Sequence, residues 1–177
     1  MTTATDSIEL YAVGDIIIKR DDPPSIFQLA KPVFAKADIV LGNCESTYSE
    51  RGSPNPMCRG AGVRAHPRNV EGLKWAGFHV MSFANNHHLD WGYEAFFDTL
   101  DLLREAGISQ VGTGKDEDEA RKPVIIEKKG VRVAFLAYAP VTFMGYEAGP
   151  NKPGSAPLTI YTYYKQVEHE QPGTAPD

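Results

Sequence analysis

The chain has little cysteine and no long apolar segment. Its two cysteines, Cys44 and Cys58, are too few for a disulfide framework and too far apart for a CxxC motif, so we expect two free thiols in a reducing compartment. No apolar run approaches the roughly 20 residues that cross a bilayer. Residues 1–7 contain neither the basic nor the apolar part of a signal peptide. These absences predict a cytoplasmic protein without a membrane span in this chain, with association with the cell envelope as the alternative.

The chain also lacks an excess of positive charge and any basic run. Lys and Arg number 18 against 23 Asp and Glu, which gives a net charge of −5 and a pI near 5.5. Proteins that bind nucleic-acid backbones neutralise phosphates with basic patches, so we expect no nucleic-acid partner. Hydrophobic residues make up 42% and charged residues 23%, as in ordinary globular proteins, which excludes general disorder.

Short apolar runs alternate with helical patterns as far as residue 112. The pattern predicts strands at residues 8–13, 39–41, 78–84 and 108–111, the first two of them buried. Between them, helical spacing covers residues 25–37, interrupted by Pro32, and residues 67–76, and it is clearest in the segment closed by Gly107. This alternation favours βαβ crossovers, an α/β fold and a mostly parallel sheet.

The remaining segments are less regular. Residues 46–62 are polar and rich in Gly, Pro and Arg, and we expect a loop over the surface. Residues 116–121 form a predicted helical turn, and two β-rich runs, 124–126 and 131–138, flank Lys129-Gly130 as a hairpin at one side of the sheet. Proline and glycine then become frequent, around one β-like run at residues 158–164. We therefore divide the chain into residues 1–145, the N-terminal half of a domain, and residues 146–177, a linker or lid that leads to a missing C-terminal half.

Polar side chains follow three of the predicted strands at the point where each strand ends. In open α/β sheets the loops at these carboxyl ends converge on the ligand. Together they supply oxygen and nitrogen donors without a sulfur ligand, a set that suits Mn, Fe, Zn or Mg. Turn formation and helix capping explain each of these motifs taken alone, whereas three such motifs on successive strand ends favour a metal site. The residues are Asp15 after the first strand, Asn43 and Glu45 after the second, and Asn85, Asn86 and His87 after the third.

Three of these segments resemble the signature of a known family. Gly14-Asp15, Gly42-Asn43-Cys44-Glu45-Ser46 and the block from Ala84 to Gly92 are similar to the bacterial capsule-synthesis protein family of the CapA or PgsA type. The resemblance covers residues 8–140. It implies poly-γ-glutamate capsule biosynthesis and membership of the calcineurin-like metallophosphoesterases. The implied fold is a layered sandwich of the metallo-dependent phosphatase type, with a C-terminal β-hairpin and apparently truncated in this chain.

The resemblance also implies a role for each residue. Asp15 would ligate the first metal, Glu45 would bridge, Asn86 would ligate the second metal, and His87 would be the catalytic imidazole. Two divalent ions would then support phosphoester hydrolysis. A further group would orient the ligands or contact substrate, although packing at a helix start is as good an explanation for His88. That group is Asn43, Asn85, His88 and Asp90.

The chain departs from the family pattern in three ways. Ile17 stands where typical calcineurin-like enzymes have a histidine ligand, Glu45 replaces the usual bridging aspartate, and only His169 remains after residue 88. The site is therefore incomplete in this chain. The leading hypothesis is a metal-dependent hydrolase, and the alternative is a non-catalytic polymer-handling or scaffold protein that retains the fold. A metal-free binding domain for a nucleotide or sugar is disfavoured, because no glycine-rich phosphate loop follows the first strand.

The expected partners follow from these hypotheses. They are an anionic polymer or a small phosphoester as substrate, and either a second copy of the chain or a missing C-terminal half. Arg51, Arg59 and Arg64 flank the predicted surface loop, where they contact an anionic substrate or simply form a solvated face.

Overall fold

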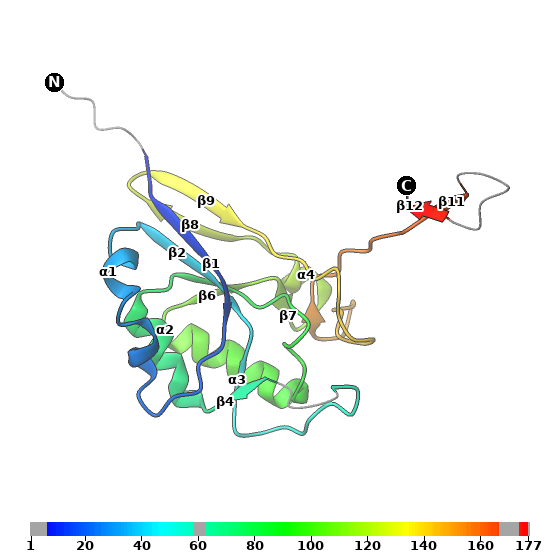
Figure 1. Ribbon diagram of the computed structural model, residues 1–177, viewed down its shortest axis with the longest axis horizontal. Coiled ribbons are helices and arrows are strands. Elements are labelled where there is room, and N and C mark those ends of the chain that lie inside the picture. The colour runs from blue at the N-terminus through cyan, green and yellow to red at the C-terminus, as the bar shows by residue number, and fades with distance from the viewer. Residues whose placement is uncertain (1–6, 59–62, 167–173, 177) are drawn as a thin grey trace.

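The central element of the fold is a parallel β-sheet. The computed structural model describes residues 7–58, 63–166 and 174–176 of the chain. Its central sheet has four strands, each parallel to its neighbours, as predicted from the alternating pattern (Figure 1). Their order in the sheet is β1 (Leu10–Ile16), β2 (Ile39–Cys44), β5 (Val80–Ser82) and β6 (Ser109–Val111).

Helices cover one face of this sheet (Figure 1). They are the 3₁₀ helices η1 (Pro23–Phe27) and η2 (Pro67–Asn69) and the α-helices α1 (Lys31–Phe34), α2 (Val70–Ala76) and α3 (Gly92–Glu105).

The ends of these helices agree with the sequence, but one helix is shorter than expected. Gly107, which follows α3, has a φ of 78°, a left-handed conformation that glycine adopts without strain. The helix expected over residues 25–37 is instead split into η1 and α1. Pro32 lies in the first turn of α1, where a missing backbone N–H needs no partner, so it starts a helix rather than interrupting one.

The core has two layers because side chains alternate across the sheet. Val40 and Met81 face the helices, in the larger apolar cluster. Ile39 and Val80 point to the opposite face. There they pack against the hairpin formed by β8 (Val124–Lys128) and β9 (Val131–Phe135).

The hairpin itself forms as expected, but its place in the fold differs from the prediction. Lys129 and Gly130 both have positive φ, as a tight hairpin turn requires. Rather than extending one side of the central sheet, β8 and β9 form a separate two-stranded sheet. Alternate apolar residues of the hairpin, including Ile126 and Phe135, cover the sheet face that the helices leave open. This face-to-face packing buries apolar side chains of both sheets, which stabilises the fold.

Two expectations about burial are wrong. The first strand was expected to be buried, but β1 lies at the sheet edge, is largely exposed, and continues through Gly14 and Asp15 to Ile16. Residues 46–49, expected in a surface loop, are buried. Here β3 (Thr47–Tyr48) pairs with β4 (Arg64–Ala65), and the Tyr48 amide donates to Thr99 of α3, which holds this segment inside the fold. Residues 59–62 of the expected loop lie outside the described residues.

The C-terminal part of the chain begins as a packed segment. The helical turn expected at residues 116–121 is α4 (Glu117–Ala120), and β10 (Gly154–Ser155) pairs with β7 (Thr113–Gly114). Tyr146, Ala148 and Ala156, which fall in the segment assigned to a linker or lid, are buried. The domain boundary after residue 145 stays a prediction.

A second, thinner part follows. Residues 158–163 form no strand, and the pair β11 (Tyr164–Gln166) and β12 (Thr174–Pro176) extends away from the rest of the molecule (Figure 1). His169 lies outside the described residues. Within the ranges that the structure describes, no helix is both long and apolar enough to cross a membrane.

Candidate functional site

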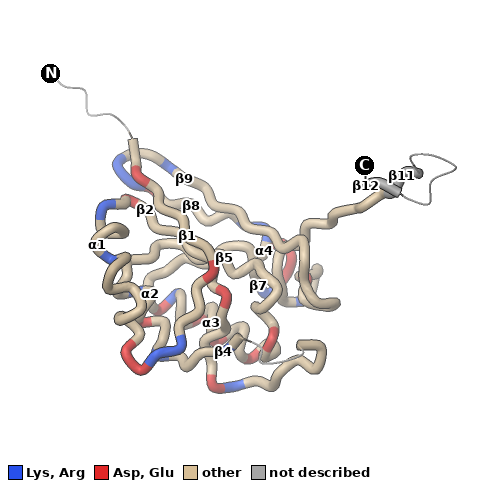
Figure 2. The backbone as a smooth tube through the Cα atoms, viewed as in Figure 1, with Lys and Arg blue, Asp and Glu red and all other residues tan. Residues whose placement is uncertain are grey.

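The register of the sheet brings the predicted polar residues together at the carboxyl ends of the strands. Asp15 lies opposite Asn43, and Asn43 lies opposite Ser82, three residues before Asn85. The register of β1 shifts between Ala12 and Asp15, which is a β-bulge. Bulges redirect side chains, and this one sets Asp15 directly beside Asn43. Figure 2 shows acidic positions, in red, at the lower end of β1.

Asn43 is the centre of this cluster. Its Nδ2 donates to Asp15 Oδ1 at 2.8 Å and to Glu45 Oε2 at 2.7 Å, so one amide group holds two carboxylates. Its Oδ1 accepts from Asn85 Nδ2 at 3.1 Å. Burial, and then repulsion from Asp15, raise the pKa of Glu45 above its ordinary value. A negative pair held this way is a place where a bound cation would relieve repulsion.

Asn85 is a positioning residue in the interior. Its Nδ2 also donates to the Cys44 carbonyl at 2.8 Å, and its Oδ1 accepts from the His87 amide at 2.9 Å. Both ends of the side chain are therefore occupied by protein groups. The two bonds tie the end of β2 to the turn that carries His87.

His87 lies between a buried carboxylate and the acidic pair. Its Nδ1 is 2.7 Å from Asp90 Oδ2, and its Nε2 is 3.5 Å from Glu45 Oε1. The His87 side chain is 27% exposed, whereas that of Asp90 is fully buried. A chain of contacts thus connects Asp15 to His87 through Asn43 and Glu45.

Asp90 is held by donors that the sequence did not reveal. Its Oδ1 accepts from Cys58 Sγ at 3.1 Å and from the Tyr146 hydroxyl at 3.3 Å. Its Oδ2 accepts from the Val63 amide at 3.1 Å, besides facing His87. Burial raises the pKa of both the Cys58 thiol and the Tyr146 hydroxyl, so both stay protonated and can donate at neutral pH.

Asn86 and His88 differ in their hydrogen bonds: the Asn86 side chain has none to the other described residues, whereas both ring nitrogens of His88 are engaged. The Asn86 side chain is half-buried and forms no hydrogen bond with the other described residues, which leaves its amide oxygen available. His88 is fully buried, with Nδ1 at 2.6 Å from the Asn85 carbonyl and Nε2 at 3.0 Å from the Tyr146 carbonyl. Burial lowers the pKa of His88. Packing explains this histidine, because neither ring nitrogen is left for a substrate.

The donor set of this cluster bears on its ability to hold a metal ion. Among the residues described, no three or more His, Cys, Asp and Glu side chains lie together in a way that could hold an ion. The cluster instead combines the carboxylates of Asp15 and Glu45 with an imidazole and amides. Such oxygen and nitrogen donors are chemically suited to Mg, Mn, Fe or Zn. Ile17, two residues after Asp15, is 43% exposed and contributes no donor atom.

A family model named bacterial capsule synthesis protein PGA_cap matches residues 9–176. The chain belongs to this bacterial capsule synthesis family. The PGA biosynthesis protein CapA of Bacillus subtilis is 30% identical over 165 residues, which cover 88% of this chain and 43% of that protein. The capsule biosynthesis protein CapA of Bacillus anthracis is 27% identical over 172 residues, or 92% of this chain and 42% of that protein.

A shorter match extends the set of relatives. A probable polyglutamine synthesis accessory protein of Mycobacterium tuberculosis is 39% identical over 92 residues, or 50% of this chain and 23% of that protein. The chain therefore spans less than half the length of each of these relatives. Membership of the capsule synthesis family confirms the resemblance drawn from the motifs after β1, β2 and β5.

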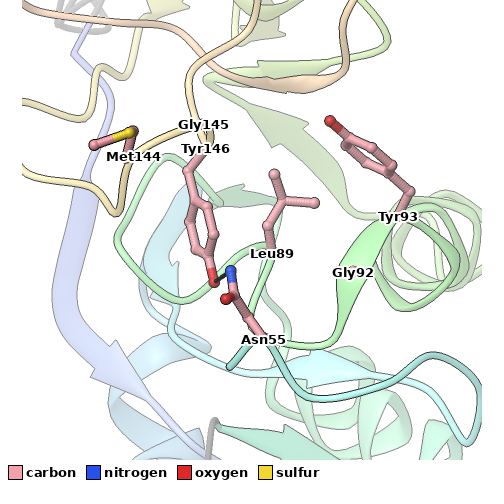
Figure 3. A pocket seen from close by; sticks show the side chains of 7 residues that line it. All are labelled: Asn55, Leu89, Gly92, Tyr93, Met144, Gly145 and Tyr146. Atoms are coloured by element: carbon pink, nitrogen blue, oxygen red, sulfur yellow. Dashed lines mark hydrogen bonds between the residues drawn. The ribbon is translucent and has the colours of Figure 1, made fainter. Parts of the chain in front are cut away.

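Within this family member, a small cavity lies behind the buried carboxylate. It measures about 190 Å³ and is formed by three segments far apart in the sequence (Figure 3). Asn55 Nδ2 donates to the Tyr146 hydroxyl at 3.0 Å, the dashed line in Figure 3. The cavity therefore adjoins the hydroxyl that contacts Asp90. Its lining residues are Asn55, Leu89, Gly92, Tyr93, Met144, Gly145 and Tyr146.

Proposed function

We propose that this chain carries the metal-binding part of a phosphoester hydrolase, with the fold of the metallo-dependent phosphatases, that acts in the biosynthesis of a poly-γ-glutamate capsule. The contact chain from Asp15 to His87 is the observation that carries the proposal. The names of the relatives, which refer to capsule, PGA and polyglutamine synthesis, support the biological setting.

The site residues have distinct roles in this proposal. Asp15, Glu45 and Asn86 would hold divalent ions, two when the site is complete. When bound, such ions polarise a phosphoryl oxygen and lower the pKa of bound water towards about 7. Asn43 and Asn85 orient these ligands through their amide groups.

His87 supplies the proton in this scheme. Its Nδ1 is engaged by Asp90, so its Nε2 is the nitrogen that faces the site. A protonated Nε2 donates to the leaving oxygen as the phosphoester bond breaks. Asp90 fixes the plane of the His87 ring, because its buried carboxylate is held by other donors and faces Nδ1 at 2.7 Å.

The test measures metal binding and hydrolysis separately. Mn²⁺ and Zn²⁺ are titrated into the chain by calorimetry, and hydrolysis of p-nitrophenyl phosphate and bis-p-nitrophenyl phosphate is followed in parallel. We expect Asp15→Asn to weaken metal binding at least about tenfold, because a charged ligand is lost. We expect His87→Ala to keep the metal while kcat falls about 100-fold or more. Asp118→Asn, at an exposed aspartate of α4, is the matched control.

A non-catalytic polymer-handling or scaffold protein is the second candidate. Ile17, in place of a histidine donor, favours it. Polymer binding without hydrolysis, in the presence of saturating metal and unaffected by Asp15→Asn and His87→Ala, would establish this function and exclude the hydrolase.

A further inference from the structure

A second cavity, of about 330 Å³, has a charge opposite to that of the acidic cluster formed by Asp15 and Glu45. Four of its lining side chains are cationic and one is a carboxylate, which leaves +3 in a chain whose net charge is −5. Such a local excess attracts anions that the rest of the molecule repels. The lining residues are Lys19, Arg20, Asp21, Arg64, Ala65, His66, Arg68 and Asn69.

The two segments that form this basic cavity are fixed to each other by a buried amide. Asn69, only 3% exposed, accepts from the Arg20 amide at 3.1 Å and donates to the His66 carbonyl at 3.1 Å. The walls are therefore set by the fold and not by the cations themselves. Arg64 lies over the Trp91 ring, with 3.7 Å from Cζ to the ring centroid, which holds the guanidinium in place.

The cations of the cavity are available to a ligand. The exposed side chains of Lys19 and Arg20 form no ion pair within the described part of the chain. Arg68 pairs with Asp21 at 2.7 Å, but Asp21 is fully exposed, and such surface pairs contribute little to stability. An incoming carboxylate can therefore take the place of Asp21 at small energetic cost.

The basic cavity is also connected to the candidate metal site in two places, by the chain after β1 and by the pair of β3 and β4. Lys19 follows Asp15 by four residues, which span at most about 14 Å of extended chain. Arg64 lies on β4, whose partner β3 begins two residues after Glu45. An extended ligand bound in the basic cavity can thus reach the acidic cluster.

We propose that the basic cavity binds the free α-carboxylates of a γ-glutamyl polymer and holds the polymer beside the metal site. This inference rests on the proposed function for the identity of the polymer, whereas the cavity and its charge stand by themselves. Arginine forks match carboxylates, and successive cations match a chain that carries one carboxylate per unit.

Binding of fluorescently labelled poly-γ-glutamate of defined length to the 177-residue chain, followed by anisotropy, tests the proposal. We expect the double variant Lys19→Ala/Arg20→Ala to weaken binding about tenfold or more and to reduce its dependence on salt. The matched control, Lys36→Ala/Lys122→Ala, removes two exposed cations elsewhere and should bind as the unmodified chain does. Thermal unfolding of each variant verifies that the fold is kept.

Three outcomes overturn the proposal. One is equal loss of binding in the test and control variants, and another is binding as tight to neutral polyglutamine. The third is no measurable binding of poly-γ-glutamate under conditions in which labelled polyphosphate binds. Failure of the hydrolase proposal is distinguishable, because His87→Ala should lower kcat about 100-fold or more in the presence of metal but leave polymer binding, measured without metal, unchanged.

Discussion

Asp90 is the side chain on which the geometry of His87 depends. A buried carboxylate without partners would cost several kcal/mol, and here four donors surround it. Two of them, from Cys58 and Tyr146, approach the oxygen that His87 does not use. Both oxygens of the carboxylate are therefore held in place, and this fixes the orientation of the His87 ring.

His88 should make stability depend on pH. Its pKa is lowered by burial, so below about pH 6.5 the unfolded chain takes up a proton that the folded chain resists. We expect the free energy of unfolding to fall between pH 6.5 and 5.5 by up to about 1.4 kcal/mol more in the unmodified chain than in His88→Gln. Urea unfolding at pH 7.5, 6.5 and 5.5 measures this difference.

Comparing the unmodified chain with His88→Gln removes the contributions of other groups to the pH dependence of the free energy of unfolding. His79, whose pKa is also lowered by burial, and Glu45, whose raised pKa acts in the opposite direction, are present in both. His66→Gln removes an exposed imidazole and serves as the control. Identical pH slopes for the unmodified chain and His88→Gln would contradict the assignment.

The residues of the candidate site could be found in the sequence because each follows the end of a predicted strand. Asp15, Glu45 and His87 are polar residues directly after apolar runs, and parallel strands bring such ends together. Cys58 and Tyr146 carry no comparable signal. Both lie in segments without periodicity, and only the packing of distant parts of the chain brings them to Asp90.

At the scale of elements, the hydrophobic periodicity predicted whether a segment is a helix or a strand better than it predicted how buried that segment is. The apolar spacing of α3 and its stop at Gly107 specify a helix with one buried face. A short apolar run such as that of β1 is equally compatible with a central and an edge strand, and the structure places it at the edge. The bulge before Asp15 is likewise invisible in the sequence, because it arises from pairing with β2.

The junction of β6 and β7 should not tolerate a side chain. Gly112 has a φ of 88°, and an added Cβ would lie 2.6 Å from the Ala84 Cβ and 2.7 Å from the Ala137 Cβ. We expect Gly112→Ala to lower the free energy of unfolding by about 2–4 kcal/mol, from backbone strain and overpacking together.

Gly130 provides a matched control for this substitution. Its φ of 76° is similar, but nothing lies within 4 Å of an added Cβ. Gly130→Ala should therefore show the backbone contribution alone, about 1 kcal/mol. Equal losses for the two variants in urea unfolding would mean that the close approach at Gly112 has no energetic effect.

On the scale of the whole molecule, apolar side chains are exposed in the segment after β9. Val141 is 76%, Met144 86% and Ile160 66% exposed. Exposed apolar surface of this kind favours association when net charge does not oppose it.

Self-association should therefore be strongest near pH 5.5, where the net charge is close to zero. Light scattering across pH 5–8 measures it, and Val141→Ser/Ile160→Ser should reduce the scattering near pH 5.5. Leu29→Ser, at a residue that is 93% exposed elsewhere, should reduce it less. Scattering that is independent of pH and of these substitutions would contradict the prediction.

The contact between Tyr146 and Asp90 spans 56 positions of the chain. The four strands of the central sheet all lie within residues 10–111, whereas the set of donors around Asp90 is complete only when Tyr146 is in place. The orientation of the His87 imidazole therefore reports that the N-terminal and C-terminal parts of the described chain have come together.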